Sequence, residues 1–272
     1  MNGVGRVNPS FVDIHCHLLP GLDDGAADQR AALAMARLAV AEGIETVVAT
    51  PHQLGNFAAN RGETIREAVV RLQALLDAEQ VPLRVLPGAD VRIEDGMLAK
   101  LKCGDVLTLA DRRRHVLLEL PHELYFPLEP LLAQLAAAGL VGILSHPERN
   151  QGILRRPALI APLVENGCLM QVTAGSLVGR FGPASQRMTE QLLTDGLVHF
   201  LATDAHGTRN RPPLMREAFA RAAELAGEQV AHQICCENPR RVAEGKEVAA
   251  GRLQTRAQRG LWRTFFSRVK VG

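Results

Sequence analysis

The sequence predicts an α/β fold in which parallel strands alternate with helices and form a barrel. Seven short apolar runs, rich in β-branched residues, alternate with longer segments of helical period, which is the pattern of βαβ units. Histidines or carboxylates follow most of these runs. In a parallel barrel the ends of all strands meet at one mouth, so groups scattered in the sequence would share one site there. For this reason a barrel explains the pattern better than an open sheet.

The predicted strands begin near the N-terminus and recur along the chain. They are Phe11–Cys16, Thr46–Thr50, Leu83–Leu86, Val116–Leu120, Leu140–Leu144, Leu169–Val172 and Val198–Ala202. Helical periodicity separates several of them, at Asp28–Glu42, Thr64–Glu79, Glu129–Ala138 and Arg187–Thr194. These lengths are those of ordinary strands and helices in a βαβ protein.

The 272 residues are long enough for one such domain. We find no internal repeat and no long linker, so we assign residues 1–250 to a single barrel and residues 251–272 to a basic C-terminal tail. In that tail, Arg259–Lys270 interleaves cations with aromatic residues. We expect a terminal helix that packs its aromatic face on the barrel, with docking to a partner or an anionic surface as the alternative.

Composition excludes several classes of function. The chain has 31 basic and 29 acidic residues, a net charge of +2, so no overall field points to nucleic acid or an anionic membrane. Five cysteines without regular spacing give no disulfide framework, and a reducing cytoplasm is the expected compartment. The sequence shows no secretory signal and no uncharged stretch long enough to cross a bilayer. We therefore predict a soluble cytoplasmic protein without membrane insertion.

His15 and His17 are the first candidate metal ligands. They stand two residues apart on a predicted strand, so both imidazoles point to the same face and can reach one ion. Asp24 follows in a Leu-Asp-Asp-Gly loop that would return a carboxylate to the same mouth. A single histidine at a strand end is more often a hydrogen-bonded core or surface residue, so the pair alone is a weak indication.

The other candidates follow the later strands and strengthen this interpretation. They are His52, Asp90, Glu119, His146, Asp204 and His206, with His122 as an exposed further candidate. One or two of the carboxylates would be explained as helix caps. Four converging carboxylates beside five histidines require cations to neutralise them. Mixed imidazole and carboxylate ligands suit Zn, Mn or Fe better than Ca or Mg.

Arginines near these positions point to a phosphate ester as substrate. The candidates are Arg149, Arg180, Arg209 and Arg211. A guanidinium group binds a phosphoryl group through two parallel hydrogen bonds and neutralises its charge. A solvated surface role is the alternative, and it suits Arg209 better than Arg149, which sits directly after a proposed ligand.

Two further motifs resemble catalytic signatures and are rejected. Cys235 and Arg241 have the C-x5-R spacing of cysteine-dependent phosphatases. The residues between them contain a proline and a glutamate but no glycine, so they cannot form a phosphate cradle of backbone N–H groups. The segment Gly175–Gly179 departs from a nucleophile elbow in the position of its second glycine, and we expect a loop at the mouth.

With these residues identified, the chain resembles the PHP (polymerase and histidinol phosphatase) family, specifically its bacterial manganese-dependent protein-tyrosine phosphatases of capsule and exopolysaccharide synthesis. The resemblance runs from about Asp13 to Arg241. The motifs that carry it are Asp13–His17, Leu22–Gly25, Ala49–His52, Pro87–Asp90, Leu118–Glu119, Ser145–Arg149 and Ala202–His206.

The resemblance implies a distorted seven-stranded barrel of the PHP type and three divalent ions, manganese by expectation, with iron or zinc possible. It implies that the ligands are His15, His17, Asp24, His52, Asp90, Glu119, His146, Asp204 and His206. Arg149 and Arg211 match family arginines that hold phosphate. Relatives usually carry glutamate where this chain has Asp90, and the shorter side chain puts one metal position in question.

The expected reaction is hydrolysis of phosphotyrosine, with a bacterial tyrosine kinase tail as the substrate protein. A metal-bridged hydroxide would attack phosphorus, while Asp204 and His206 assist proton movement. A small-molecule phosphatase of histidinol-phosphate type would share the metal centre. A metal-dependent amidohydrolase would need a carbamylated lysine where this chain has Glu119. A non-catalytic scaffold for the polysaccharide machinery would follow if Asp90 disabled a metal position.

Overall fold

The computed structural model describes residues 9–255 and has an α/β architecture built on parallel strands. The strands form two sheets, one of three strands in the order β1-β2-β4 and one of six in the order β3-β5-β6-β7-β8-β9. Every pairing within these sheets is parallel. The predicted α/β class with a parallel arrangement is therefore confirmed.

Each of the seven predicted runs overlaps a strand, and Phe11–Cys16 has its predicted bounds. The strands are β1 (Phe11–Cys16), β2 (Ile44–Ala49), β3 (His52–Gln53), β4 (Arg84–Pro87), β5 (Asp90–Arg92), β6 (His115–Glu119), β7 (Val141–Ser145), β8 (Leu169–Thr173) and β9 (Phe200–Ala202). The sequence did not indicate β3 and β5 as separate strands. Ala49 pairs with Pro87, and pairing resumes between His52 and Asp90. Pro51 has no N–H to donate between these points, so the ladder is interrupted there.

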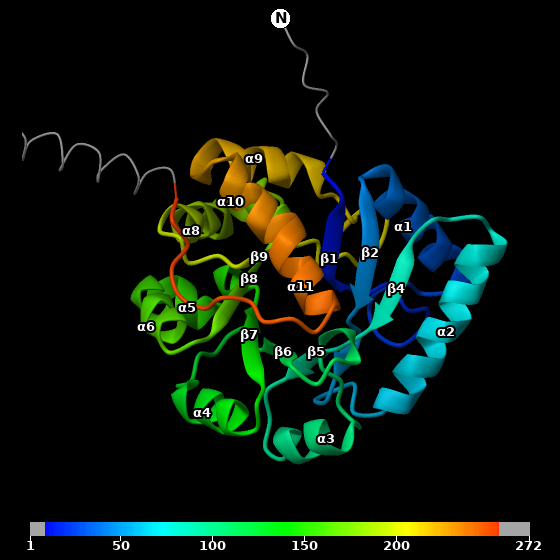
Figure 1. Ribbon diagram of the computed structural model, residues 1–272, viewed down its shortest axis with the longest axis horizontal. Helices are drawn as coiled ribbons and strands as arrows, with labels where there is room; N and C mark the ends of the chain where they lie inside the picture. Colours follow the sequence, from blue (N-terminus) through cyan, green and yellow to red (C-terminus); the bar gives the residue numbers. More distant parts are fainter. Residues whose placement is uncertain (1–8, 256–272) are drawn as a thin grey trace, which may run out of the picture.

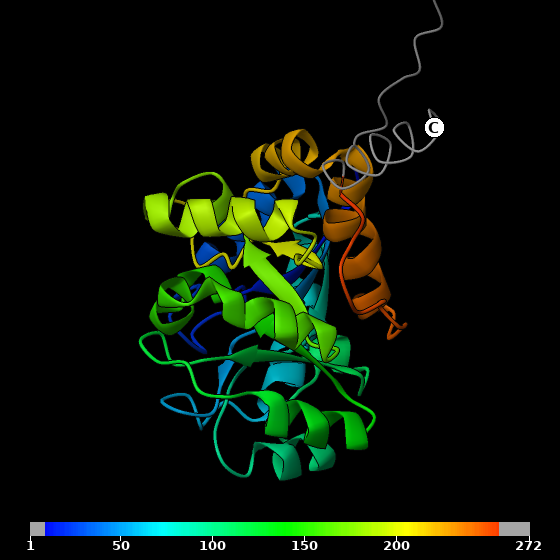
Figure 2. The same cartoon turned by 90° about the vertical axis from the view of Figure 1, so that its left-hand side faces the viewer.

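Helices surround the strands (Figure 1), and a view from the side shows them stacked along the outer surface (Figure 2). The α-helices are α1 (Gln29–Ala41), α2 (Gly62–Ala78), α3 (Met97–Cys103), α4 (Glu129–Ala137), α5 (Gln151–Arg155), α6 (Ile160–Glu165), α7 (Ala174–Leu177), α8 (Gly182–Thr194), α9 (Arg216–Ala226), α10 (Glu228–His232) and α11 (Asn238–Ala243). Shorter turns are η1 (Leu109–Asp111), η2 (Pro147–Arg149), η3 (Pro157–Leu159) and the π-helical η4 (Gln233–Glu237).

The four predicted helices correspond to α1, α2, α4 and α8. At the start of α1 the Asp28 carboxylate accepts the Ala31 N–H at 2.7 Å, which satisfies one of the free donors of the first turn. The expected loop at Gly175–Gly179 is wrong in part, because residues 174–177 form the short helix α7. A buried helical turn satisfies backbone groups that a loop at this depth would leave without partners.

A buried apolar cluster fills the space between the strands. It takes residues from strands of both sheets, namely Val12, Ile14, Val48, Leu117, Ile143, Leu169, Phe200 and Ala202, with Leu86 packed against them. A larger cluster joins the strands to the surrounding helices. The strands are therefore covered on both faces, as expected for a parallel sheet.

The ends of β1 and β9 lie together, although they are far apart in the sequence. Cys16 forms an isolated parallel bridge with Ala205. The His17 N–H donates to the Ala205 carbonyl at 2.9 Å, and the Asp204 N–H donates to the His15 carbonyl at 2.7 Å. This contact brings the first and last candidate ligands to the same place.

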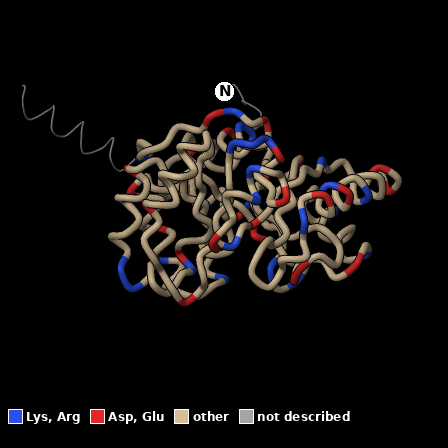
Figure 3. Tube along the Cα trace, turned by 90° about the horizontal axis from the view of Figure 1, so that it is seen from below, with Lys and Arg blue, Asp and Glu red and all other residues tan. Residues whose placement is uncertain are grey.

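The charged residues of the described chain are mixed in sign along the trace (Figure 3), which agrees with the absence of an overall field. No helix within residues 9–255 combines the length and the apolar composition needed to cross a bilayer. All five cysteines are free thiols. The expected tail helix at Arg259–Lys270 lies outside the described residues.

Candidate metal centre

All nine predicted metal ligands converge where β1, β2, β4, β6, β7 and β9 end and where β3 and β5 begin. Their nitrogen and oxygen atoms form four overlapping groups, and within each group the ligand atoms lie within 4.8 Å of one another. The groups are His17, Asp24, His52 and His206; His15, Asp90 and His146; His15, His17 and Asp204; and His52, Asp90 and Glu119. Because the groups share members, one side chain lies between neighbouring positions, which is the arrangement of a multinuclear centre.

One side of the centre is fully buried. His15 Nε2 lies 3.3 Å from Asp204 Oδ1 and 3.6 Å from Asp90 Oδ2. His17 Nε2 lies 3.4 Å from the same Asp204 oxygen, and His146 Nε2 lies 4.0 Å from Asp90 Oδ2. His15, His17 and Asp90 have no exposed surface. These side chains point inward at a depth where ions need partners.

The other side opens to solvent. Asp24 Oδ1 lies 3.4 Å from His206 Nε2 and 3.5 Å from His52 Nε2, and the Asp24 side chain is 59% exposed. The opposite nitrogen of His52, Nδ1, lies 3.4 Å from Asp90 Oδ2 and 3.7 Å from Glu119 Oε2. His52 therefore faces two of the groups and connects the open side to the buried side.

Several buried polar atoms at this site have no hydrogen-bond partner. They are both carboxylate oxygens of Asp90, Nδ1 of His52 and Nε2 of His206. A buried polar group without a partner costs about 1–3 kcal/mol, and a carboxylate costs more. The imidazole and carboxylate donors together fit divalent ions of the Mn, Fe and Zn type. Cations at these positions would satisfy all four atoms.

Two neighbours that the sequence did not indicate orient the paired histidines of β1. His17 Nδ1 lies 2.6 Å from Asp23 Oδ2, and His15 Nδ1 lies 2.8 Å from Gln171 Oε1. Both oxygens accept a hydrogen bond from Nδ1–H, which leaves Nε2 of each neutral ring to bind a metal. Asp23 stood beside Asp24 in the quoted motif, but nothing in the sequence related Gln171 to His15.

The electrostatics place most ligands in the protonation state that binds cations. Burial lowers the pKa of His146 to about 3, so this imidazole is neutral. Burial opposes ionisation of Asp204, yet the nearby His15, the hydrogen bond with His17 and the Arg211 charge hold its pKa well below its usual range. Burial favours the neutral form of His17, but its contacts with Asp204 and Asp23 outweigh this and raise its pKa to about 10. Metal binding would therefore release a proton from His17.

The pKa of Glu119 is raised, whereas that of Asp204 is lowered. Burial and the neighbouring Asp90 charge raise the pKa of its carboxyl group to about 7. Two carboxylates this close repel each other unless a cation lies between them. The proximity of Asp90 and Glu119 is therefore a further feature that fits a cation.

Local backbone geometry presents several of the ligands. His146 directly follows β7, Asp204 lies two residues after β9, and their φ angles are 32° and 51°. Side chains rarely adopt this left-handed region, and such strain is concentrated at functional sites. In the loop that carries Asp24, a Cβ on Gly25 would lie 2.2 Å from the His17 carbonyl oxygen. Only glycine fits there.

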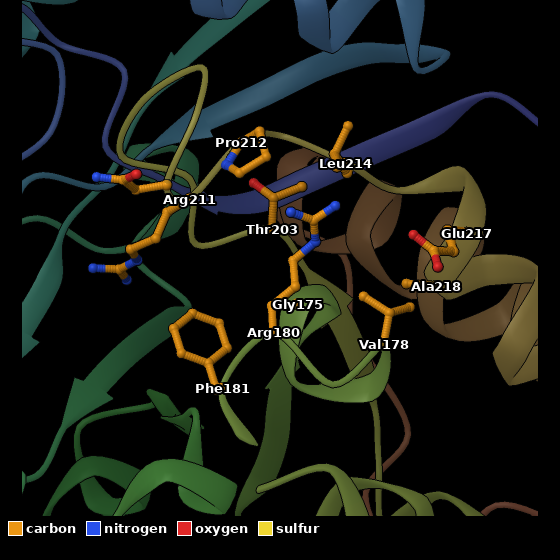
Figure 4. A pocket seen from close by; sticks show the side chains of 11 residues that line it. Gly175, Val178, Arg180, Phe181, Thr203, Arg211, Pro212, Leu214, Glu217 and Ala218 are labelled. Atoms are coloured by element: carbon orange, nitrogen blue, oxygen red, sulfur yellow. The ribbon is translucent and has the colours of Figure 1, made fainter. Parts of the chain in front are cut away.

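Two of the four candidate arginines reach the centre. Arg149 Nη1 donates to Asp204 Oδ2 at 2.5 Å, and Arg211 Nη2 donates to the same oxygen. Arg180 and Arg209 are exposed and make neither contact. The expectation that Arg209 is a surface residue agrees with its exposure, and Arg180 instead lines a small neighbouring pocket (Figure 4).

A cavity of about 200 Å³ opens above the buried ligands. Its lining includes Asp24, His52, Glu119, His146, Arg149, Asp204 and Arg211. His122 also lines it but is exposed and belongs to none of the four ligand groups. A second cavity of about 230 Å³, beside Phe57 and Arg92, shares His52 and Glu119 with it. The metal-binding atoms are thus accessible from solvent on one side.

The two rejected motifs lie away from this chemistry. Cys235 is fully buried in η4, and burial raises the pKa of its thiol well above the usual value, so it is not a thiolate nucleophile. Ser176 is buried in α7 and donates to Glu148 Oε1 at 2.7 Å. Its hydroxyl therefore has a structural partner.

The fold and the site define an α/β protein with a metal-binding centre at the ends of its strands and two guanidinium groups beside it. Residues 11–244 match the family described as Capsular polysaccharide synthesis, CpsB/CapC. The chain belongs to this family, and the expected relationship to bacterial capsule-associated tyrosine phosphatases is confirmed.

Named relatives agree with this assignment. The chain is 39% identical over 211 residues to tyrosine-protein phosphatase YwqE of Bacillus subtilis, covering 77% of this chain and 82% of the relative. It is 24% identical over 237 residues to tyrosine-protein phosphatase CpsB of Streptococcus pneumoniae, covering 85% and 98%. Both relatives span most of the described domain.

Solved structures show the same fold. A structure from a study of YwqE and CpsB as unique metal-dependent tyrosine phosphatases superposes with a TM-score of 0.85 at 34% identity, covering 90% of this chain and 98% of that one. A β-aspartyl dipeptidase from Fervidobacterium islandicum has a TM-score of 0.51 at 15% identity, covering 91% and 76%. The second similarity concerns the fold alone.

Proposed function

We propose that this chain is a metal-dependent phosphomonoester hydrolase that removes phosphate from phosphotyrosine in proteins. The observation that carries the proposal is the convergence of nine metal-binding side chains beside two guanidinium groups. Similarity to YwqE, which is named a tyrosine-protein phosphatase, supports the choice of substrate. The kinase tail expected from the sequence is the proposed partner.

The proposed cofactor is a set of three divalent ions, with manganese first and iron or zinc as alternatives. His15, His17 and Asp204 would hold the buried position, and His17, Asp24, His52 and His206 would hold the most open one. Asp90 would hold a further position, with His15 and His146 or with His52 and Glu119. Bound cations lower the pKa of water and polarise a phosphoryl oxygen.

The arginines would bind the phosphate. Arg149 and Arg211 approach one oxygen of Asp204 from the cavity side, and both side chains are mostly buried. A phosphoryl group that enters the cavity would accept hydrogen bonds from both guanidinium groups and be neutralised by them. We therefore assign to them the stabilisation of the equatorial phosphate oxygens.

Asp204 and His206 would handle protons. Asp204 Oδ1 lies 3.7 Å from His206 Nδ1, and that nitrogen also lies 3.0 Å from the Asp204 carbonyl oxygen. Burial lowers the pKa of His206, so its imidazole is neutral, and its Nδ1–H donates to the Asp204 carbonyl oxygen. His206 and the exposed Asp24 line a neighbouring cavity, which connects the imidazole to solvent.

The proposal also covers the barrel, the division into domain and tail, and the cellular location. We propose that the two sheets form one distorted seven-stranded barrel, because the bridge between Cys16 and Ala205 joins β1 to β9 and the shared cluster draws on seven strands. We propose that residues 1–250 are its single domain and residues 251–272 a separate tail. The five free thiols support a reducing, cytoplasmic location.

A small-molecule phosphatase of histidinol-phosphate type is the main rival. It would have the same metal centre, and the difference would lie at the rim. The opening on the side of Asp24 and the adjoining cavity beside Phe57 favour a peptide over a small metabolite. The amidohydrolase alternative stays weak because Glu119 occupies the place of the carbamylated lysine.

One experiment tests the proposal and separates these rivals. The purified protein is stripped of metal, reloaded with manganese, iron or zinc, and assayed with a phosphotyrosine peptide and with histidinol phosphate. We expect turnover of the peptide only after metal is restored. Undiminished hydrolysis by the stripped protein would contradict metal dependence, preference for histidinol phosphate would establish the rival, and metal binding without hydrolysis would favour a scaffold.

A further inference from the structure

Phe181 lies against both arginines of the proposed phosphate site. The guanidinium carbon of Arg149 stands 4.2 Å from the centre of the Phe181 ring, and that of Arg211 stands 5.9 Å from it. These are the cation–π contacts found among the described residues. A single aromatic ring therefore contacts the two cations that also share one oxygen of Asp204.

The position of this ring is determined by its neighbours. Phe181 directly precedes α8 and is partly exposed. It packs so closely on Gly175 that a Cβ there would lie 2.9 Å from Cε2 of the ring. Figure 4 shows Phe181 on the same side of the pocket as Arg211. The ring cannot move toward Gly175, so it presents a defined face to the guanidinium groups.

We propose that Phe181 is a positioning residue that holds Arg149 and Arg211 in place for the phosphate group, an inference that rests on the proposed function. The two guanidinium charges repel each other, and the single negative charge of Asp204 offsets only part of this repulsion. An aromatic face attracts cations without accepting the hydrogen bonds that a phosphate needs. A second carboxylate in this place would hold the arginines equally well but would cancel the charge that attracts phosphate.

The substitution Phe181→Leu removes the ring face while it keeps an apolar side chain. We expect manganese-loaded F181L to bind inorganic phosphate about tenfold more weakly in calorimetry, since each cation–π contact contributes a modest attraction. KM for the phosphotyrosine peptide should rise by a similar factor, with a smaller change in kcat. Metal content should not change. Phe181→Tyr keeps the ring and should restore both values.

Gly175→Ala gives an independent test because it acts by displacing the ring. Alone, G175A should weaken phosphate binding severalfold. In the F181L background the same change should have little further effect, since the crowded ring is already gone. If F181L is too unstable to purify, G175A and Phe181→Met, which has similar bulk and no ring, provide the same comparison.

Phe126→Leu is the matched control. Phe126 packs partly buried against the core and makes no cation–π contact among the described residues, so F126L should bind phosphate as the wild type does. Unchanged phosphate affinity and KM in F181L, or additive effects of G175A and F181L, would overturn the inference. A wild-type protein that binds phosphate but hydrolyses no phosphotyrosine would refute the proposed function and leave this binding test valid.

Discussion

Two histidines at opposite ends of the strands, His17 and His199, are equally buried and have opposite pKa shifts. At the C-terminal end, His17 has no exposed surface and contacts with Asp23 and Asp204 raise its pKa to about 10. At the N-terminal end, His199 also has no exposed surface, and burial lowers its pKa to about 4. The difference between them is the presence of carboxylates, since burial is the same.

His199 serves as a structural link. Its Nδ1 accepts the Met170 N–H at 3.1 Å, and its Nε2 donates to the Gly251 carbonyl at 2.9 Å. The second bond ties the segment after α11 to the strands. His115, the first residue of β6, is likewise buried with its pKa lowered to about 4 by burial and by Arg114. Neither imidazole faces a carboxylate.

This comparison explains why a histidine count is a poor guide to a metal site. Burial lowers the pKa of an imidazole wherever it occurs. Only where several carboxylates converge does the same imidazole become part of a site that attracts cations. The candidate metal centre is therefore identified by its combination of histidines and carboxylates. The predictions below test the two ends of the strands separately.

The largest effect, a loss of activity, is expected from substitutions in the candidate metal centre. Replacement of His15 and His17 by alanine removes two proposed ligands of the buried position. We expect hydrolysis of an aryl phosphate to fall by at least about a thousandfold, by loss of cation-assisted chemistry. Activity assays and metal analysis measure this. His232→Ala, at an exposed histidine, is the control. Activity within tenfold of wild type in the double variant would contradict the assigned centre.

Removal of metal should destabilise the folded protein. Without cations, the oxygens of Asp90 have no partner. Binding at a thousand times the dissociation constant contributes about 4 kcal/mol, which corresponds to a fall in Tm of roughly 10 °C for a domain of this size. Thermal unfolding with and without a chelator measures it. The variant without His15 and His17 should respond much less, and an unchanged wild-type Tm would argue against a cation at the buried wall.

The opposite end should show a pH-dependent loss of stability. Unfolded His199 takes up a proton near pH 6.5, whereas the folded imidazole resists it until about pH 4. Stability from this group is therefore complete above about pH 6.5 and lost as the pH falls toward 4, by up to about 3 kcal/mol. His199→Gln keeps an acceptor and a donor without the titration.

Urea unfolding of the wild type and H199Q at pH 7 and pH 4.5 checks this prediction. The wild type should lose more stability than H199Q between the two values, and contributions from the metal centre cancel in the difference. The exposed His232→Gln change should leave the loss of stability between pH 7 and pH 4.5 as it is in the wild type. Equal losses in the wild type and H199Q would show that His199 is protonated without cost in the folded state.

The smallest effect separates the two partners of the β1 histidines. Asp23→Ala removes a charged acceptor from His17, and we expect metal affinity to fall about 10–100-fold. Gln171→Ala removes a neutral acceptor from His15 and should cost less, because hydrogen bonds to charged groups are stronger. Metal titration of both variants measures the difference. Equal losses would mean that charge at this outer position has no influence on the ligands.

Much of the site was predictable because its residue types are specific. The spacing of His15 and His17 on one strand placed both rings on one face, and the other ligands each followed an apolar run. All nine candidates lie in the four ligand groups. The basic tail at residues 251–272 was also predicted, and that prediction stays untested.

Other features of the fold and site depend on contacts between distant segments, which local sequence patterns do not encode. Gln171 lies in the middle of β8 and looks like an ordinary buried strand residue until it meets His15, 156 positions away. In the sequence Arg180 was a candidate for phosphate binding like Arg149 and Arg211. In the structure the adjacent Phe181, and not Arg180, contacts those two arginines. The separate strands β3 and β5 arise where proline interrupts the ladder.

By itself the sequence determined the α/β class, the approximate strands and the set of candidate metal ligands, because periodicity and residue chemistry are local properties. Only the tertiary structure decided which histidines meet carboxylates, which arginines face the cavity and what orients each ring. These depend on distances between segments far apart in the chain. Electrostatic interactions fall off with distance, so the same residue type acquires different chemistry at the two ends of the strands.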